Sequence, residues 1–441
     1  DMMSLISGGL VKGEKMLTAE QNIRITQTGA STPMGQLLRR YWHPIAPSGE
    51  INEENPTKEV RLMSEDLVLF RSTAGKVGLI EPSCPHRKAN LSYGVPEPEG
   101  IRCAYHGWLF DETGACVDQP SEPAGSRFKD KVKMKAYPVQ EFAGLIWAYM
   151  GPLPAPILPK WDALTWENAW RDMYYCTLPC NWLQCQENSL DPVHFEWLHR
   201  YWGGWVQNKR LPEPERAIWN TQTLPRGRHQ IKVGFDRFEY GIIKRRLLQG
   251  ESEQDEWWRI GHPIIFPNIL RVGEAHPTEV GWVHAFQYRI PIDDTHTLHI
   301  VHRNFLPRPG VTYPKQDQSQ VPWKEVPALD EQGRPRNTWV VAQDQSAWIT
   351  QGAISDRSTE ALGVTDVGII MFRNLIEEQI RIVEEGGEPM NVHRTDKGPI
   401  SLPQEYSYYP GYDVTGGPFR DQPNRKPDLV ANLSDEAGVS L

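Results

Sequence analysis

Two short stretches, Cys84-Pro85-His86 and Cys103-Ala104-Tyr105-His106, decide how this sequence is interpreted, and sixteen residues separate them. Two thiolates and two imidazoles can hold one tetrahedral zinc ion, or they can hold the two irons of a sulfide-bridged cluster. Zinc is the less favoured interpretation, because zinc-binding pairs usually have roughly two to four intervening residues and the first pair here has only one. Pro85 stiffens the first loop and Gly107 lets the second loop turn back sharply. The pattern predicts two hairpin loops that hold an iron–sulfur cluster at their tips.

The residues around these stretches predict a small antiparallel β domain. Short β-rich runs such as Leu67–Phe70 and Gly144–Tyr149 alternate with turn residues between about 58 and 150. The proline-rich segment Gly151–Pro156 marks the end of this region. Before it, Thr32-Pro33 forms an N-cap and N1-proline signature, which predicts a short helix running through Tyr41.

Beyond residue 156 the sequence mixes helices with long strands, for example Tyr240–Leu248. A long amphipathic helix is predicted from Asp366 to Glu385, because apolar residues recur at helical spacing and Gly386-Gly387 ends the run. The last fifty residues are dense in Pro, Gly, Asp and Tyr, and an irregular tail is expected there. The fold class is therefore α+β.

A second motif contains Asn188, Asp191, His194 and His199. The first three recur at i, i+3 and i+6, which on a helix would put them nearly on one face. His199 lies five residues after His194, about 140° away on an ideal α-helix, so both can bind one ion only if the helix is distorted or ends between them. Pro192 is a local cause for such an irregularity. Two His plus a distant carboxylate form the facial triad of non-haem iron oxygenases, whereas two ordinary helix histidines are the plain alternative.

Composition narrows the classes of function. The chain has 47 basic and 56 acidic residues, a net charge of −9, and no Lys/Arg-rich run, so a nucleic-acid partner is not expected. No apolar stretch reaches the ~20 residues that span a bilayer, so no membrane association is expected. Six cysteines are few for 441 residues, which argues against a disulfide framework. We expect a cytoplasmic protein.

Taken together, the motif N-x2-D-x2-H-x4-H that follows C-x-H–x16–C-x2-H resembles the Rieske non-haem iron aromatic-ring oxygenases. Thr32–Gly35, Arg40–Trp42 and Gln343-Asp344 are similar to the phthalate dioxygenase group, which includes aryl-ether-cleaving and O-demethylating members. The resemblance implies an oxygenase (alpha) subunit that forms a head-to-tail trimer or a dimer of trimers. It also implies an N-terminal helical segment at 1–45 packing on the catalytic domain, an all-β Rieske [2Fe-2S] domain at 46–155, and a catalytic domain at 156–441. In the catalytic domain an antiparallel sheet would wrap around the long helix in a helix-grip arrangement.

The resemblance also assigns roles to residues. The [2Fe-2S] ligands would be Cys84, His86, Cys103 and His106, and the mononuclear Fe(II) ligands would be His194, His199 and a carboxylate. Asp344 is the chosen carboxylate, and Asp356 and Asp366 are the alternatives. Asp191 would be the catalytic residue that bridges a metal-bound His to a Rieske His of the neighbouring subunit.

The implied reaction uses O₂ as co-substrate. Electrons from NAD(P)H would arrive through a separate flavin and iron–sulfur reductase or a ferredoxin, because the chain has no nucleotide or flavin motif. The substrate would be a small aromatic acid, oxidised by O-demethylation or another monooxygenation, or by cis-dihydroxylation of the ring. Lys244-Arg245-Arg246 would either bind the substrate carboxylate or form a solvated basic edge. A Rieske electron carrier without catalysis and a zinc-stabilised binding module are the remote alternatives.

Overall fold

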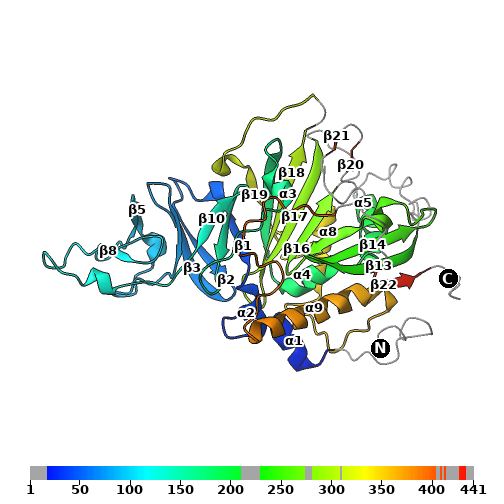
Figure 1. Ribbon diagram of the computed structural model, residues 1–441, viewed down its shortest axis with the longest axis horizontal. Helices are drawn as coiled ribbons and strands as arrows, with labels where there is room; N and C mark the ends of the chain where they lie inside the picture. Colours follow the sequence, from blue (N-terminus) through cyan, green and yellow to red (C-terminus); the bar gives the residue numbers. More distant parts are fainter. Residues whose placement is uncertain are drawn as a thin grey trace.

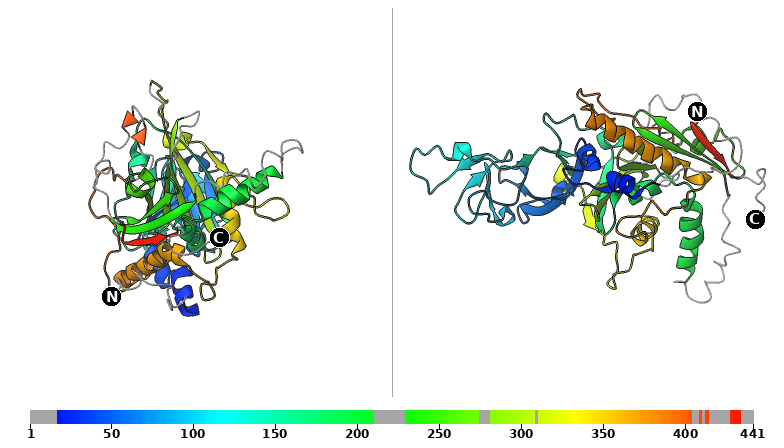
Figure 2. Two further views of the ribbon diagram at one scale, coloured as in Figure 1. Left: turned by 90° about the vertical axis from the view of Figure 1, so that its right-hand side faces the viewer. Right: turned by 90° about the horizontal axis from the view of Figure 1, so that it is seen from below.

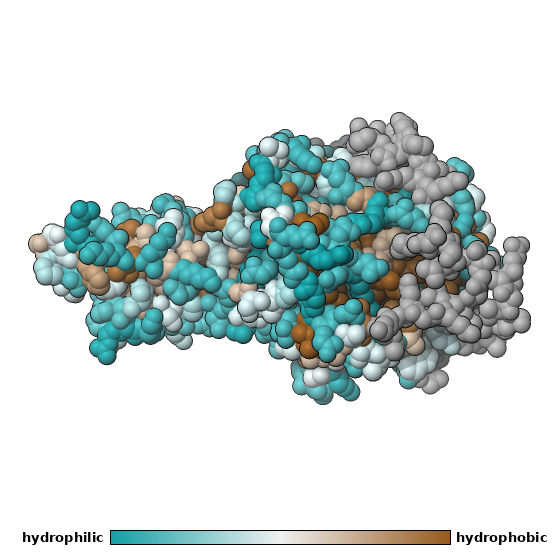
Figure 3. Space-filling model, turned by 60° about the horizontal axis from the view of Figure 1, so that its bottom comes forward, coloured by the Kyte–Doolittle hydropathy of each residue, from teal (hydrophilic) through white to brown (hydrophobic). Residues whose placement is uncertain are grey.

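The computed structural model of the chain describes residues 17–209, 229–273, 281–307, 310–403, 408–409, 412–413 and 427–433. Figure 1 shows an elongated molecule with a narrow β-rich end and a broader end built on one large sheet. In the view of Figure 3 the narrow end is mostly hydrophilic, and the larger brown patches lie over the broader end. The predicted α+β class is confirmed.

Three small antiparallel sheets make up the narrow end. Their strands are β1 (Trp42–Pro47), β10 (Val139–Phe142) and β11 (Leu145–Tyr149); β2 (Thr57–Leu62), β3 (Glu65–Arg71), β4 (Val77–Ile80) and β9 (Ala136–Tyr137); and β5 (Val95–Glu97), β6 (Gly100–Arg102), β7 (Leu109–Phe110) and β8 (Cys116–Asp118). The predicted strand Leu67–Phe70 lies inside β3, and β11 covers all of the second predicted strand except Gly144. The antiparallel β domain is therefore confirmed.

The broader end is organised by a nine-stranded sheet. Its strands, in spatial order, are β19 (Trp323–Glu325), β12 (Trp170–Leu178), β18 (Thr297–Leu306), β17 (Trp282–Pro291), β16 (Ile269–Gly273), β15 (His262–Ile265), β14 (Gly241–Leu248), β13 (Gln230–Phe238) and β22 (Leu429–Asn432). All neighbours pair antiparallel except β12 and β19. The expectation of an irregular tail is wrong for Leu429–Asn432, because these residues pair with β13 and supply the edge strand.

The long helix α9 (Val367–Glu384) lies along one face of this sheet, as Figures 1 and 2 show. Its bounds are within one residue of the predicted ones, because the apolar spacing and the glycine stop are both local signals. Phe372 packs edge-on against Phe266 with ring centroids 5.9 Å apart. The helix also approaches β13 closely, since a Cβ on Gly368 would lie 2.2 Å from the Phe235 ring.

Two short N-terminal helices, α1 (Ala19–Thr26) and α2 (Pro33–Leu38), pack near α9. Thr32 caps α2 as predicted, accepting a hydrogen bond from the Gly35 N–H at 3.1 Å. The helix ends at Leu38, so the expectation that it continues to Tyr41 is wrong. On α1, Arg24 forms ion pairs with Glu377 and Glu384 of α9. The N-terminal helices are thus fastened to the catalytic end of the molecule.

Besides short 3-10 helices, the remaining helices and strands are α3 (Asp162–Thr165), α4 (Trp182–Asn188), the π-helix η5 (Phe195–Trp202), α5 (Gly203–Asn208), α7 (Glu256–Arg259), α8 (Val340–Thr350), β20 (Tyr408–Tyr409) and β21 (Tyr412–Asp413). In the part of the chain that the structure describes, no helix has the length and apolarity needed to cross a membrane. The helices η5 and α8 carry His199 and Asp344, two of the predicted iron ligands.

Candidate metal centres

The two finger loops at the narrow end close in the same way. In the first loop the Lys88 N–H donates to the Cys84 carbonyl at 2.8 Å, and in the second the Gly107 N–H donates to the Cys103 carbonyl at 3.0 Å. Both donors have positive φ, 63° at Lys88 and 75° at Gly107. Gly107 also needs to lack a side chain, because a Cβ would lie 2.9 Å from the Pro120 ring. Each loop thus turns back four residues after its cysteine, as predicted for the second.

The finger side chains are arranged with sulfur inside and imidazole outside. Cys84 and Cys103 are buried in the small core of this end, and burial together with the neighbouring Cys103 raises the pKa of Cys84 to about 11. His86 is exposed, its ring centroid is 4.4 Å from that of His106, and its ring stacks on Trp108. A metal that binds here must displace protons from buried thiols and can be reached from outside through the imidazoles.

The finger side chains form two pairs. Cys84 and Cys103 lie close enough for their thiol groups to interact, and the rings of His86 and His106 lie next to each other. In a Rieske cluster two thiolates hold one iron and two imidazoles hold the other. The pairing of the finger side chains fits these two irons.

The second motif lies on a broken helix. As the spacing of the two histidines requires, the helix is interrupted: α4 ends at Asn188, and Asp191 accepts hydrogen bonds from the N–H groups of Val193 (2.7 Å) and His194 (3.3 Å) before the next helical segment. From Phe195 the chain forms the π-helix η5, whose hydrogen bonds run from i to i+5. Residues five apart therefore share one side, and the ring centroids of His194 and His199 are 5.2 Å apart. This is the distortion that the spacing requires.

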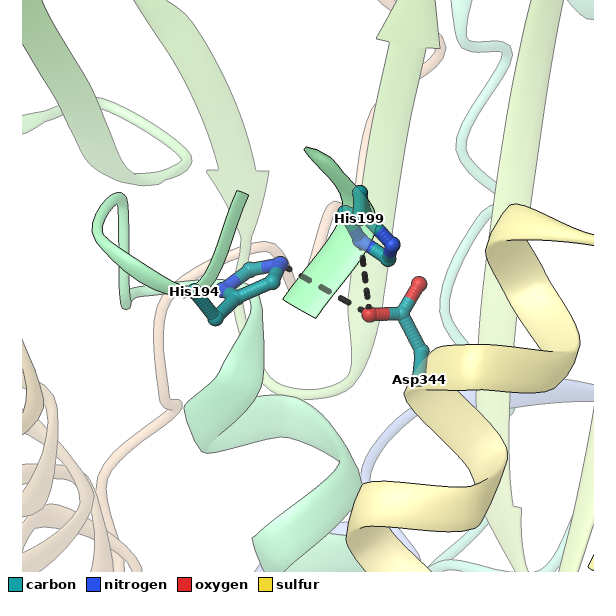
Figure 4. A group of neighbouring side chains, drawn as sticks. All are labelled: His194, His199 and Asp344. Atoms are coloured by element: carbon teal, nitrogen blue, oxygen red, sulfur yellow. Dashed lines mark ion pairs between the residues drawn. The ribbon is translucent and has the colours of Figure 1, made fainter. Parts of the chain in front are cut away.

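The helix α8 supplies the carboxylate. Asp344 Oδ1 lies 3.1 Å from His199 Nε2 and 3.6 Å from His194 Nε2, and Figure 4 shows both rings directed toward it. Among the described residues, the buried Asp344 Oδ1 has no hydrogen-bond partner apart from these contacts. A carboxylate oxygen and two imidazole nitrogens converging on one point fit a divalent iron. The sequence predicts that Asp344 stands just before a helix that begins near Ser346; this expectation is wrong, because α8 begins at Val340 and Asp344 lies within it.

The two alternative carboxylates are placed elsewhere. Asp356 is exposed and accepts hydrogen bonds from the backbone and hydroxyl of Ser358. Asp366 accepts a hydrogen bond from the Gly363 N–H at 2.7 Å, next to the start of α9. Neither belongs to the His194 group. Both are turn- or helix-capping residues.

Asp191 lies next to His194, on the Nδ1 side of the ring, whereas Nε2 faces Asp344. Its Oδ2 is 3.6 Å from His194 Nδ1, and 28% of its side chain is exposed. Burial raises the pKa of Asp191, but the contact with His194, the hydrogen bond from the Val193 N–H and the charge of Lys244 together outweigh burial, so the pKa falls below its usual range. An ionised, partly exposed carboxylate next to a ligand ring is accessible to a neighbouring molecule.

Two of the three basic residues of β14, Lys244 and Arg246, face the same centre. Lys244 and Arg246 alternate with Arg245, and all three are buried, which makes the solvated-edge interpretation wrong. Arg245 points to the opposite face and pairs with Asp236 at 2.7 Å. The charge of Lys244 helps to lower the pKa of Asp191 and opposes the rise in that of His199. The guanidinium of Arg246 lies 4.3 Å from the ring centroid of Phe195, next to His194.

Sequence reasoning missed one side chain at this centre. Gln343 Oε1 lies 3.0 Å from His199 Nδ1, on the side of the ring away from Asp344. The sequence contains no signal for this contact other than the position of Gln343 directly before Asp344.

An iron–sulfur finger domain joined to a His-His-Asp centre defines a Rieske-type oxygenase. A Rieske [2Fe-2S] domain model matches residues 41–141. The chain is 43% identical over 384 residues to the 5,5'-dehydrodivanillate O-demethylase oxygenase subunit of Sphingobium sp. (strain NBRC 103272 / SYK-6), covering 86% of this chain and 84% of that protein. It is 30% identical over 406 residues to the phthalate 4,5-dioxygenase oxygenase subunit of Pseudomonas putida, covering 84% and 88%.

The chain belongs to the Rieske non-haem iron oxygenases, as an oxygenase subunit. Among solved structures, NdmA of Pseudomonas putida CBB5 is similar in fold, with a TM-score of 0.58 at 19% identity over 80% of this chain and 94% of that one. Oxygenase subunits of this family depend on a separate electron-transfer partner. The remote alternatives of a pure electron carrier and a zinc-stabilised module do not describe such a subunit.

Substitution of Asp344 should affect the mononuclear iron and leave the iron–sulfur cluster in place. We expect Asp344→Ala to lower the iron content from about three to about two per chain and to leave the acid-labile sulfide and the red-brown colour unchanged. Metal analysis and the visible absorption spectrum measure this. Asp356→Ala is the matched control and should keep all of the iron; full iron content in Asp344→Ala would contradict the assignment.

Proposed function

We propose that this oxygenase subunit oxidises an aromatic carboxylate, with O-demethylation of a methoxy group as the principal reaction. The observation that carries the proposal is the buried cationic face of β14, formed by Lys244 and Arg246, next to the His194, His199 and Asp344 group. The 43% identity to an O-demethylase subunit supports the reaction type. Ring cis-dihydroxylation is the second candidate, which the similarity to a phthalate 4,5-dioxygenase subunit favours.

When bound, the mononuclear iron supplies open coordination positions for O₂, and the Rieske cluster supplies electrons one at a time. The three protein ligands approach from one side, so the opposite side stays free for the reactants. The protein's own task is to hold the aromatic ring at a fixed distance and angle, because a small displacement changes which carbon is oxidised.

Arg246 is suited to bind a carboxylate. Its guanidinium carbon lies 3.5 Å from the ring centroid of Trp257 and 4.3 Å from that of Phe195, so aromatic faces hold the fork in one orientation. A planar guanidinium can donate two parallel hydrogen bonds to a carboxylate. Dehydrodivanillate and phthalate, the substrates named for the two relatives, are both aromatic carboxylates. A cation desolvated in this way favours an anionic substrate over its neutral analogue.

Electron delivery supports a trimer in this proposal. Figure 1 shows the sheet with β5 and β8 at one end of the molecule, and α8 and α5 toward the other. A cluster at the finger tips would therefore be distant from an iron bound in the same chain. The proposed route enters from a reductase or ferredoxin that draws on NAD(P)H, and crosses to the iron of a neighbouring subunit through Asp191. The 52%, 48% and 42% exposed side chains of Trp197, Tyr201 and Trp205 provide an apolar surface for such an assembly.

A single turnover of the chemically reduced protein with ¹⁸O₂ tests the reaction type. Methoxybenzoates, phenoxybenzoates and phthalates are supplied, and products are identified by mass spectrometry. We expect formaldehyde and a phenol whose oxygen is unlabelled, because demethylation retains the aryl oxygen and cleaves the O–CH₃ bond. A dihydrodiol with two labelled atoms would replace this proposal with ring dioxygenation. No oxidised product from any member of the panel would reject the substrate class.

Arg246→Met keeps much of the side-chain length and removes the charge. We expect kcat/KM for the aromatic acid to fall about 10- to 100-fold, since a hydrogen bond to a charged group contributes roughly 1.5–3 kcal/mol. The neutral methyl ester of the same acid is the control, because it lacks the carboxylate, and its kcat/KM should change little. An equal loss for acid and ester would show that Arg246 does not recognise the carboxylate.

Asp191→Asn tests the path between subunits. The amide oxygen can still accept the hydrogen bonds from Val193 and His194, so both metals and the melting temperature should be retained. Steady-state turnover should nearly disappear, because the ionised link between the two centres is lost. Stopped-flow oxidation of the reduced cluster in the presence of substrate and O₂ measures the step directly. Normal cluster oxidation in this variant is incompatible with a bridging role.

A further inference from the structure

We propose that Gln343 is a positioning residue for the iron ligand His199, and that Gly203 leaves the space that Gln343 needs. The inference rests on the proposed iron site. It adds a residue that neither binds the metal nor touches the substrate, and that decides which ring nitrogen of His199 faces the ion.

The first observation is the contact itself. Gln343 is 2% exposed and precedes Asp344 on α8. Its Oε1 lies 3.0 Å from His199 Nδ1, whereas Nε2 of the same ring lies 3.1 Å from Asp344 Oδ1. The two sides of the imidazole are therefore held by successive residues of one helix, so any shift of α8 moves both contacts together.

The second step concerns the tautomer. A neutral imidazole that binds a metal through Nε2 carries its proton on Nδ1, and this N–H requires an acceptor when it is buried. Gln343 Oε1 is that acceptor. Without it, the ring either leaves a buried donor unsatisfied or turns over and presents Nδ1 to the ion. An acceptor behind a ligand ring also increases the basicity of the ligand nitrogen.

Gly203 supplies an independent observation. It follows the π-helix η5 and lies four residues after His199, in ordinary helical geometry with φ −58°. Its backbone therefore does not require glycine. A Cβ at this position, however, would lie 2.7 Å from Gln343 Nε2 and 3.1 Å from its Oε1. Glycine at this position serves the close approach of the glutamine amide to the helix that carries His199.

The neighbouring Gln345 provides a contrast within the same helix. It is also buried, at 3%, and its amide nitrogen contacts His299 Nδ1 at 3.0 Å and Cys176 Sγ at 3.2 Å. His299 lies in β18 and is not part of the His194 group. Gln345 thus makes a buried amide contact of the opposite direction, donating to a histidine outside the candidate metal group, and it serves as a control for the loss of a buried glutamine from α8.

Metal binding to the trimer, stripped of its mononuclear iron but with the oxidised Rieske cluster retained, tests the proposal. The variants are Gln343→Leu, Gln343→Glu, Gly203→Ala and Gln345→Leu. The Kd for Co²⁺ is measured by equilibrium dialysis, and the EPR spectrum of the bound Co²⁺ reports its ligand geometry. Melting temperatures are recorded for every variant.

We expect Gln343→Leu to raise the Kd about 10- to 100-fold and to change the Co²⁺ spectrum, as loss of an acceptor behind a ligand does. Gly203→Ala should also raise the Kd and change the Co²⁺ spectrum. Gln343→Glu keeps an acceptor, so its Kd should stay within a few-fold of the parent value. Gln345→Leu should alter the melting temperature without altering the Kd. An unchanged Kd in Gln343→Leu, or equal weakening by Gln343→Glu or by Gln345→Leu, would overturn the proposal.

The same experiment separates this inference from the proposed function. If the parent protein takes up no Co²⁺ at this centre, or if Asp344→Ala binds Co²⁺ as tightly as the parent, the iron site itself is wrong. If the parent binds and Asp344→Ala does not, the site stands, and the four variants decide the role of Gln343 alone.

Discussion

Two histidines five residues apart must face one ion, and an α-helix cannot bring this about. The π-helix η5 satisfies that constraint, because its i to i+5 hydrogen bonds bring His194 and His199 to one side. Such a segment needs firm ends. Asp191 accepts hydrogen bonds from the N–H groups of Val193 and His194 just before its start, and the preceding helix α4 is anchored by Glu187, which pairs with Arg357 at 2.7 Å and with Arg373 of α9 at 2.6 Å. The rest of the catalytic end is arranged around this distorted turn.

The two metal centres meet opposite physical demands. The finger loops must exchange electrons with other molecules, so their imidazoles lie outside while the sulfur ligands are buried in a small apolar core. The His-His-Asp group, by contrast, is mostly withdrawn from solvent, with side-chain exposures of 17% for His194, 6% for His199 and 11% for Asp344. One chain that carries both kinds of centre at separate ends can connect them through a second copy, and a partly exposed acid such as Asp191 is available for that connection.

The parts of this arrangement that depend on local patterns could be predicted from the sequence. The finger loops, α9 and the cap of α2 depend on ligand spacing, apolar periodicity and an N1 proline. Pro192 indicated an irregularity in the second motif, but the position of the break after Asn188 could not be predicted, because Asp191 and His194 also fit helical spacing. The structure brings Asp344 together with the two histidines, but its place inside α8 and its contact distances come from tertiary packing. The contact of Gln343 joins residues 144 positions apart, and no single sequence specifies such a pair.

The metal ligands alone do not determine the reaction. The same His-His-Asp group serves any substrate that enters, so selectivity must come from the groups that hold the aromatic ring. In the proposed function these groups include two cations on one face of β14, with Arg246 held between Phe195 and Trp257. A substrate whose carboxylate is bound by Arg246 would be fixed at that end, and its ring could move only about this point. The distance from Arg246 to the iron would then select the substrate atom that reacts. If the atom that reaches the iron is the methyl carbon of a methoxy group, the product is a phenol; if it is a ring carbon, the product is a diol.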